Sequence, residues 1–267
     1  MLKNKIVFFG TPSFAVVCLK KLLEQKFNIL AVVTAIDKRA GRGKKLKSSD
    51  IKNFAIQNGL DLFQPENMKD YHFVEKIKSL KPDFIIVVAF RMMPKKIWEI
   101  PFFGTINLHA SLLPNYRGAA PINWAIINNE KYTGVTTFYI NENIDSGDIL
   151  LQKKVEISEN ETAGTLHDKL SFEGSQLLCE TIDRLSKNKI IAKPQKLLDD
   201  IKLAPKINAE NSHLNLGKKI DQIKSTIRGL SPSPGAWVTL KSKKTSIVMK
   251  IFDSDSIICE NQNKSHT

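Results

Sequence analysis

The sequence has few features of a secreted or membrane protein. Its 267 residues include three cysteines, Cys18, Cys179 and Cys259, without C-x-x-C spacing. Neither a disulfide framework nor a thiolate zinc site is therefore indicated. No apolar run is long enough to cross a bilayer, and the charged N-terminus passes into a short strand pattern without a signal-peptide core. We expect a soluble, unprocessed protein of the reducing cytoplasm that does not contact a membrane.

Two further absences concern cofactors. The five histidines show no metal-ligand spacing, so no metal ion is expected. The turn at Gly10-Thr11-Pro12 lacks the G-x-G-x-x-G spacing that lets a backbone approach a pyrophosphate. A nicotinamide-dependent dehydrogenase is therefore the weakest interpretation.

The chain has an excess of positively charged residues. Lysine and arginine total 40 against 27 acidic residues, a net charge of +13. Such a balance favours a polyanionic partner such as RNA or DNA, although a solvated lysine-rich surface explains the same count. Apolar residues make up 42% of the chain, enough for one large α/β domain or for a main domain with a small appendage.

Near-continuous apolar runs alternate with helical patterns in the first two thirds of the chain. We predict strands over 6–9, 29–33, 84–89 and 105–109, with helices after the first strand and near 49–58 and 71–80. This alternation is typical of an α/β fold with a doubly wound, mostly parallel, Rossmann-like sheet. A helix near 120–128, strands over 133–139 and 149–155, and an amphipathic helix over 166–185 follow.

The pattern changes near residue 190 to a lysine-rich polar sequence that contains Pro194 and Pro205. We therefore predict a catalytic domain over 1–190, a linker over 191–205 and a small second unit over 206–267. The second unit shows a helix over 220–230, a turn at 231–235, and strands over 237–240 and 247–252. It has room for a helix and a hairpin, and is too short to complete a closed five-stranded barrel.

Three polar residues suggest chemistry at one end of the predicted sheet. Asn107 and His109 are separated by one residue in a strand, so both side chains lie on the same face. They also lie near the carboxyl end of that strand, where ligands of open α/β sheets gather. Asp145 follows in a turn between two later strands. Either strand residue alone could simply satisfy a strand-end hydrogen bond, whereas the three together favour acyl transfer.

These residue types suit attack by an amine on a formyl carbon. The carbonyl oxygen becomes negative, and both the Asn107 amide and a protonated His109 ring could donate to it. Asp145 would stabilise the protonated ring and relay a proton. Direct transfer is expected, because no serine or cysteine in this segment has a base beside it. Ser111 is the weaker nucleophile candidate and is better explained as a loop hydrogen-bonder, as Asp148 is as a turn residue.

Three segments carry a resemblance to a known family. The run from Asn107 to Pro121, with Thr133-Gly-Val-Thr136 and Asp145-Ser-Gly-Asp148, resembles the methionyl-tRNA formyltransferases, which are folate-dependent formyltransferases. The similarity extends from Ile6 to about Gly235. It implies that Asn107, His109 and Asp145 are catalytic and that 10-formyltetrahydrofolate is the donor. It further implies a folate site that contains Phe90, Arg91, Met92, Ser111, Leu112, Leu113 and Pro114.

Arg91 stands where many members of the family have glycine, which affects the shape of the pocket. Met92 and its neighbour Met93 could form an adaptable apolar wall, and burial in the core explains them equally well.

The acceptor of the formyl group is less closely determined by the sequence. Glycinamide ribonucleotide and sugar-amine formyltransferases share the same trio of residues that corresponds to Asn107, His109 and Asp145. The stretch 39–47 resembles a basic insertion that enters the tRNA acceptor stem in the family, although its composition alone suits a solvated charged loop. We expect a monomer that formylates methionyl-initiator tRNA for translation initiation. A sugar-amine formyltransferase and an inactive RNA-binding protein are the alternatives. The expected tRNA contacts, with Arg42 the principal one, are Arg39, Arg42, Lys44 and Lys45.

The second unit departs from the family, whose C-terminal domain is usually a longer OB-like barrel. We expect a shortened OB-like domain here, and therefore a weaker grip on tRNA from this part of the chain. Overall positive charge would offset part of that loss through phosphate contacts.

Overall fold

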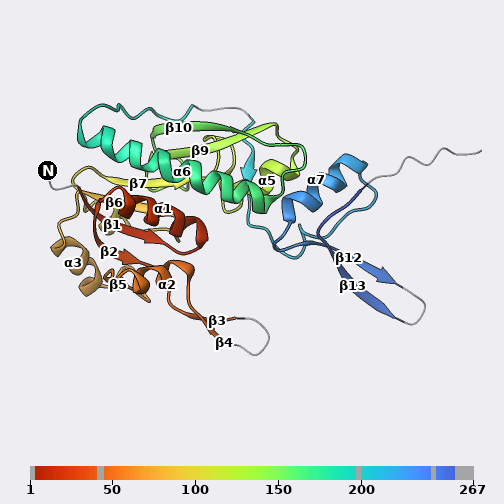
Figure 1. Ribbon diagram of the computed structural model, residues 1–267, viewed down its shortest axis with the longest axis horizontal. Coiled ribbons are helices and arrows are strands. Elements are labelled where there is room, and N and C mark those ends of the chain that lie inside the picture. The colour runs from red at the N-terminus through yellow and green to blue at the C-terminus, as the bar shows by residue number, and fades with distance from the viewer. Residues whose placement is uncertain (1–3, 41–44, 197–199, 242–244, 256–267) are drawn as a thin grey trace, which may run out of the picture.

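The computed structural model describes residues 4–40, 45–196, 200–241 and 245–255. Its centre is a seven-stranded sheet in the order β10-β9-β7-β6-β1-β2-β5 (Figure 1). Five neighbouring strands are parallel, β9 runs antiparallel to β7, and β10 antiparallel to β9. The predicted doubly wound, mostly parallel sheet is confirmed. Its strands are β1 (Lys5–Gly10), β2 (Asn28–Val33), β5 (Leu62–Phe63), β6 (Phe84–Val88), β7 (Thr105–His109), β9 (Tyr132–Tyr139) and β10 (Ile149–Glu156).

Two apolar cores cover the two faces of the sheet. Along β1, Ile6 and Phe8 face one core, while Val7 and Phe9 face the other. The first core is closed by α1 (Ser13–Glu24), α2 (Asp50–Gln57) and α6 (Ala163–Ser186), and the second by α3 (Tyr71–Ser79) and α4 (Lys95–Trp98). Burial on both faces explains why the strand is apolar at every position rather than at alternate ones.

A short ribbon appears where the sequence suggested a loop. Strands β3 (Lys38–Ala40) and β4 (Lys45–Lys47) pair antiparallel and project beyond α2 and β5 (Figure 1). At its base the Asp37 carboxylate accepts hydrogen bonds from Lys52 Nζ at 2.7 Å and Gln64 Nε2 at 3.0 Å. The Lys52 bond is the main reason that the pKa of Asp37 is lowered. Arg42 and Lys44 lie outside the described residues, and the side chains of Arg39 and Lys45 are not described.

The second unit contains the predicted helix and hairpin. Helix α7 (Ile220–Leu230) is followed by β12 (Ala236–Lys241) and β13 (Ser246–Ile251), which pair antiparallel. Within the described residues the hairpin is a two-stranded sheet and not part of a closed barrel. Helix α7 packs against α5 (Pro121–Ile127), and Asn123 Nδ2 donates to Gly229 O at 2.7 Å. The second unit is therefore joined to the rim of the main sheet through α5.

The segment predicted as a linker is paired with the main unit where it is described. Strand β11 (Leu203–Ala204) runs parallel to β8 (Arg117–Gly118), and Lys193 forms an isolated bridge with Ile149 of β10. The proposed division at 190 and 206 thus separates segments that touch. No helix in the described ranges is both long enough and apolar enough to cross a membrane.

Candidate active site

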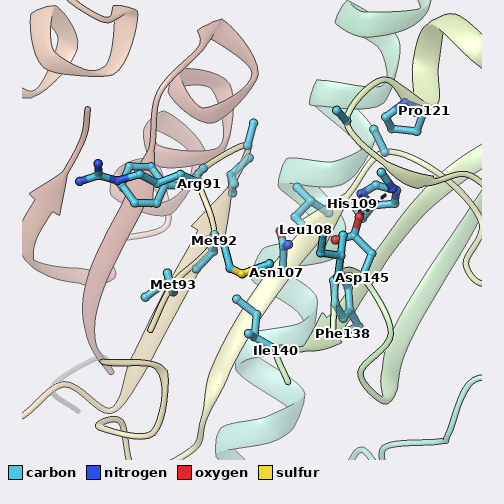
Figure 2. Close-up of a pocket in the computed structure, with 18 of the residues that line it drawn as sticks. Arg91, Met92, Met93, Asn107, Leu108, His109, Pro121, Phe138, Ile140 and Asp145 are labelled. Carbon is cyan, nitrogen blue, oxygen red and sulfur yellow. Dashed lines mark hydrogen bonds and ion pairs between the residues drawn. The ribbon is translucent and has the colours of Figure 1, made fainter. Parts of the chain in front are cut away.

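Strand β7 places Asn107 and His109 on one wall of a cavity of about 850 Å³ (Figure 2). Leu108, between them, packs on α6, where a Cβ added at Gly174 would lie 2.9 Å from Leu108 Cδ2. The cavity also includes Val87 and Val88 at the end of β6. The site therefore lies at the carboxyl ends of neighbouring parallel strands, as expected for an open α/β sheet.

Asp145 reaches the same cavity from the loop between β9 and β10. Its Oδ2 atom lies 3.7 Å from His109 Nδ1, and the two side chains are only 13% and 8% exposed. The backbone N–H of Gly118 donates to the same oxygen at 2.9 Å. Asp145 has φ +49°, an uncommon conformation for a residue with a side chain. The structure thus brings together the three residues that the sequence singled out.

A backbone carbonyl determines which nitrogen of His109 faces the carboxylate. His109 Nε2 lies 2.8 Å from Tyr116 O. Because a carbonyl oxygen only accepts, Nε2 carries a hydrogen. Nδ1 therefore holds the lone pair of the neutral ring, and protonation there places the second N–H beside Asp145.

The Asn107 side chain has a different environment. It is partly buried and lines the cavity. Within the described part of the chain, no other group forms a hydrogen bond with its amide, in contrast to the Asp145 carboxylate. The amide N–H groups are therefore available to a bound oxygen.

Phe90, Arg91 and Met92 all line the cavity, as the resemblance implied. The Arg91 guanidinium nevertheless turns away from the trio (Figure 2) and donates to Pro65 O at 2.6 Å and Met68 Sδ at 3.2 Å. An arginine at this position is thereby accommodated without its charged end entering the pocket.

The sequence left open whether Met92 and Met93 form a pocket wall or belong to the core, and the two residues differ in this respect. Met93 is buried and belongs to one of the sheet cores while also touching the cavity. Met92 is 68% exposed and extends toward Asn107 (Figure 2). Met92 thus adds an exposed, unbranched thioether side chain to the apolar wall.

Residues 111–114 lie behind the cavity wall and are not among the described residues that line it. Ser111 is fully buried and donates to Asn115 O at 2.7 Å. Leu113 N donates to Thr136 Oγ1 at 3.2 Å, and Leu112 lies next to Gly134. The chain turns inward after His109, so Ser111, Leu112, Leu113 and Pro114 support the loop. A direct folate contact from this segment stays a prediction that the cavity does not support.

Several cavity residues carried no signal in the sequence. Pro12 and Phe14 reach the cavity from the start of α1, and His167 from α6. Gly118 belongs to the family-like run, but its contact with Asp145 spans 27 positions and leaves no local pattern. The exposed Asp148 lies outside the lining, which agrees with a turn role. No cluster of three or more potential metal ligands occurs in the described ranges.

Two protein-family models match this chain. A family model described as "Formyl transferase" matches residues 4–182, and a second, "Formyl transferase, C-terminal domain", matches 206–263. A methionyl-tRNA formyltransferase of Flavobacterium johnsoniae is 48% identical over 254 residues, which are 95% of this chain and 81% of that protein. The chain belongs to the methionyl-tRNA formyltransferase family. A methionyl-tRNA formyltransferase of Thermodesulfovibrio yellowstonii is 49% identical over 248 residues, 92% of this chain and 80% of that protein.

The fold also matches solved structures outside the methionyl-tRNA formyltransferases. The sugar 3N-formyl transferase WlaRD superimposes with a TM-score of 0.65 at 23% identity, over 86% of this chain and 79% of that one. At that identity the match shows the fold alone.

Proposed function

We propose that this protein transfers a formyl group from 10-formyltetrahydrofolate to the α-amino group of methionyl-initiator tRNA, acting as a cytoplasmic monomer. The observation that carries the proposal is the convergence of Asn107, His109 and Asp145 on one cavity. The close similarity to curated methionyl-tRNA formyltransferases supports the choice of reaction and acceptor.

The cavity next to the trio has the size and the apolar lining of a small-molecule site. Its volume of about 850 Å³ lies in the usual range for small-molecule sites, about 300–1,000 Å³. Met92, Trp98 and Ile140 supply apolar surface to its lining. The WlaRD structure was determined with dTDP and 5-N-formyl-THF, which is consistent with a folate in this fold. Folate bound here would supply the formyl carbon, with Phe90, Arg91 and Met92 against its ring.

The three residues can stabilise the charges that develop during the reaction. When the amine attacks, the formyl oxygen becomes negative, and Asn107 Nδ2 and a protonated His109 Nδ1 can donate to it. Asp145 stabilises the protonated imidazole across 3.7 Å. The buried position of both groups strengthens these interactions, because little water competes with them.

Proton movement completes the reaction. The new bond joins the amine nitrogen to the formyl carbon, and the amine then carries an excess proton. The Asp145 carboxylate accepts that proton, directly or through water, and returns it to the leaving nitrogen as the old carbon–nitrogen bond breaks. The products are formylated methionyl-tRNA and tetrahydrofolate. No covalent enzyme intermediate is needed, and the buried, hydrogen-bonded Ser111 is not placed to form one.

The β3–β4 ribbon and the net charge of +13 support tRNA as acceptor. A projecting basic ribbon can enter a groove and grip phosphates. The tRNA contacts at Arg39, Arg42, Lys44 and Lys45 are part of this proposal.

An acceptor assay separates the proposal from its alternatives. Purified protein and 10-formyltetrahydrofolate are incubated with charged initiator tRNA, with charged elongator methionine tRNA, and with an amino-sugar nucleotide. We expect turnover with the initiator tRNA. Turnover of the sugar alone would establish the sugar-amine reaction. Binding of tRNA without turnover would support an inactive RNA-binding protein and contradict our mechanism.

A further inference from the structure

Gln195 lies in the segment that leaves α6 and returns past β10 toward the second unit (Figure 1). Two residues earlier, Lys193 exchanges backbone hydrogen bonds with Ile149 at 2.7 and 2.9 Å. This pairing anchors the segment beside the start of β10. The Gln195 side chain is thereby brought close to the loop that precedes β10, which carries Asp145.

The side-chain amide of Gln195 forms four hydrogen bonds. Its Nε2 donates to Asp145 O at 2.9 Å and to Gly147 O at 2.8 Å. Its Oε1 accepts from Arg117 Nε at 3.1 Å and Arg117 Nη2 at 2.6 Å. Two N–H donors and two lone pairs are the full capacity of this amide. Each bond reaches across at least 48 positions of sequence.

The three partners of Gln195 belong to the two chain segments that place the Asp145 carboxylate. Arg117 directly precedes Gly118, whose N–H holds Asp145 Oδ2. Gly147 fits so closely that an added Cβ would lie 1.7 Å from Tyr139 O. Asp145 itself has positive φ, which is costly for a residue with a side chain and needs support from its surroundings. Gln195 supplies that support from outside the cavity, whose lining does not include it among the described residues.

We propose that Gln195 is a positioning residue that holds the Asp145 carboxylate against His109. The inference rests on the proposed formyl transfer for its kinetic consequence and on the hydrogen bonds above for its structural one. The segment predicted as a linker therefore takes part in assembling the site. A misplacement of about 1 Å in a catalytic group can lower a rate by about 10²-fold.

Three variants test the proposal. Gln195→Met removes all four hydrogen bonds, whereas Gln195→Glu keeps oxygens for Arg117 and loses both donors to Asp145 O and Gly147 O. Lys196→Ala is the matched control, because Lys196 is exposed and adjacent. We expect both Gln195 variants to lower kcat about 10- to 100-fold. The KM values for folate and tRNA, and those of the control, should change less than about twofold. Wild-type kcat in Gln195→Glu would overturn the proposal, as would a loss that only follows a lower Tm.

A double-mutant cycle tests whether Gln195 acts through Asp145. In the Asp145→Asn background, Gln195→Met should cause little further loss of kcat. Full additivity of the two losses would contradict the proposal.

Hydrogen–deuterium exchange gives a readout that does not require turnover. In Gln195→Met, amides of the loop 140–148 should exchange faster than in the wild type and in Lys196→Ala. Unchanged exchange would overturn the positioning role. If the wild type failed to formylate tRNA, the proposed function would fail, and exchange alone would still decide the role of Gln195.

Discussion

The His109 ring is oriented by Tyr116, a neighbour that does not enter the reaction. Tyr116 O accepts a hydrogen bond from Nε2, and the Tyr116 phenol donates to Glu130 Oε1, which holds this residue in place. Burial, with the Glu130 bond, raises the pKa of the Tyr116 phenol above its ordinary value, so the phenol stays neutral and continues to donate. The orientation of the imidazole therefore depends on a short network behind the active site.

Replacement of His109 tests the mechanism at the residue scale. His109→Ala removes the cationic donor to the formyl oxygen, and we expect kcat to fall by at least about 10²–10³. Folate binding, measured by titration, should change little, since the apolar wall is untouched. His72→Ala, at an exposed position on α3, is the control. Full activity of His109→Ala would rule out the proposed role of the ring.

The three residues of the site differ in how well the sequence predicted their placement. Asn107 and His109 were expected on one face because a strand alternates its side chains, and both line the cavity. The Asp145 contacts with Gly118 and Gln195 join residues 27 and 50 positions apart. Long-range hydrogen bonds of this kind leave no periodic trace in a sequence. The loop hydrogen bond of Ser111 was expected, but the position of residues 111–114 outside the cavity lining and the outward turn of Arg91 escaped prediction for the same reason.

At the scale of elements, the β3–β4 ribbon is the feature most closely tied to the acceptor. The ribbon is short and charged. At its base, Lys52 and Gln64 donate hydrogen bonds to the Asp37 carboxylate. Its strands are too short and too polar to show an alternation of buried residues, which explains why a loop was expected. The major strands β1 and β6 were predicted within one or two residues, because each contains a continuous apolar run, and β7 was predicted with its observed bounds.

Charge reversal in the ribbon tests its role. Arg42→Glu should raise the KM for tRNA and leave folate binding unchanged, since it removes one phosphate contact and adds repulsion. The salt dependence of tRNA binding should also weaken by about one unit of slope. Lys189→Glu, at an exposed site beyond α6, makes the same change of net charge elsewhere. Equal effects of the two variants would show that total charge, not the ribbon, attracts the tRNA.

At the scale of the whole molecule, the joint between α5 and α7 connects the two units. Ser225 Oγ donates to Ile127 O at 3.0 Å, and Asn123 Nδ2 donates to Gly229 O. Ala119 to Asn123 also line the cavity, so the joint and the active site share one helix. A firm joint would keep the orientation of the second unit constant relative to the site.

A single methyl group tests how tightly the joint is packed. A Cβ added at Gly229 would lie 2.6 Å from Ile127 Cγ1 and 3.0 Å from Asn123 O. Gly229→Ala should therefore lower the free energy of unfolding by about 1–3 kcal/mol, measured by urea denaturation. Gly217→Ala, which would meet only the Asn215 side-chain oxygen, is the control. Wild-type stability of Gly229→Ala would mean that the helices can separate freely.

Local pattern was enough to establish the parallel sheet, the order of its main elements, and the shared face of Asn107 and His109. These follow from burial and from the geometry of a strand, which act over a few neighbouring residues. Packing of distant segments decided the approach of Asp145, the hydrogen on His109 Nε2 and the use of Gln195 as a clamp. Such contacts depend on where loops meet once both cores have closed, and no short stretch of sequence contains that information.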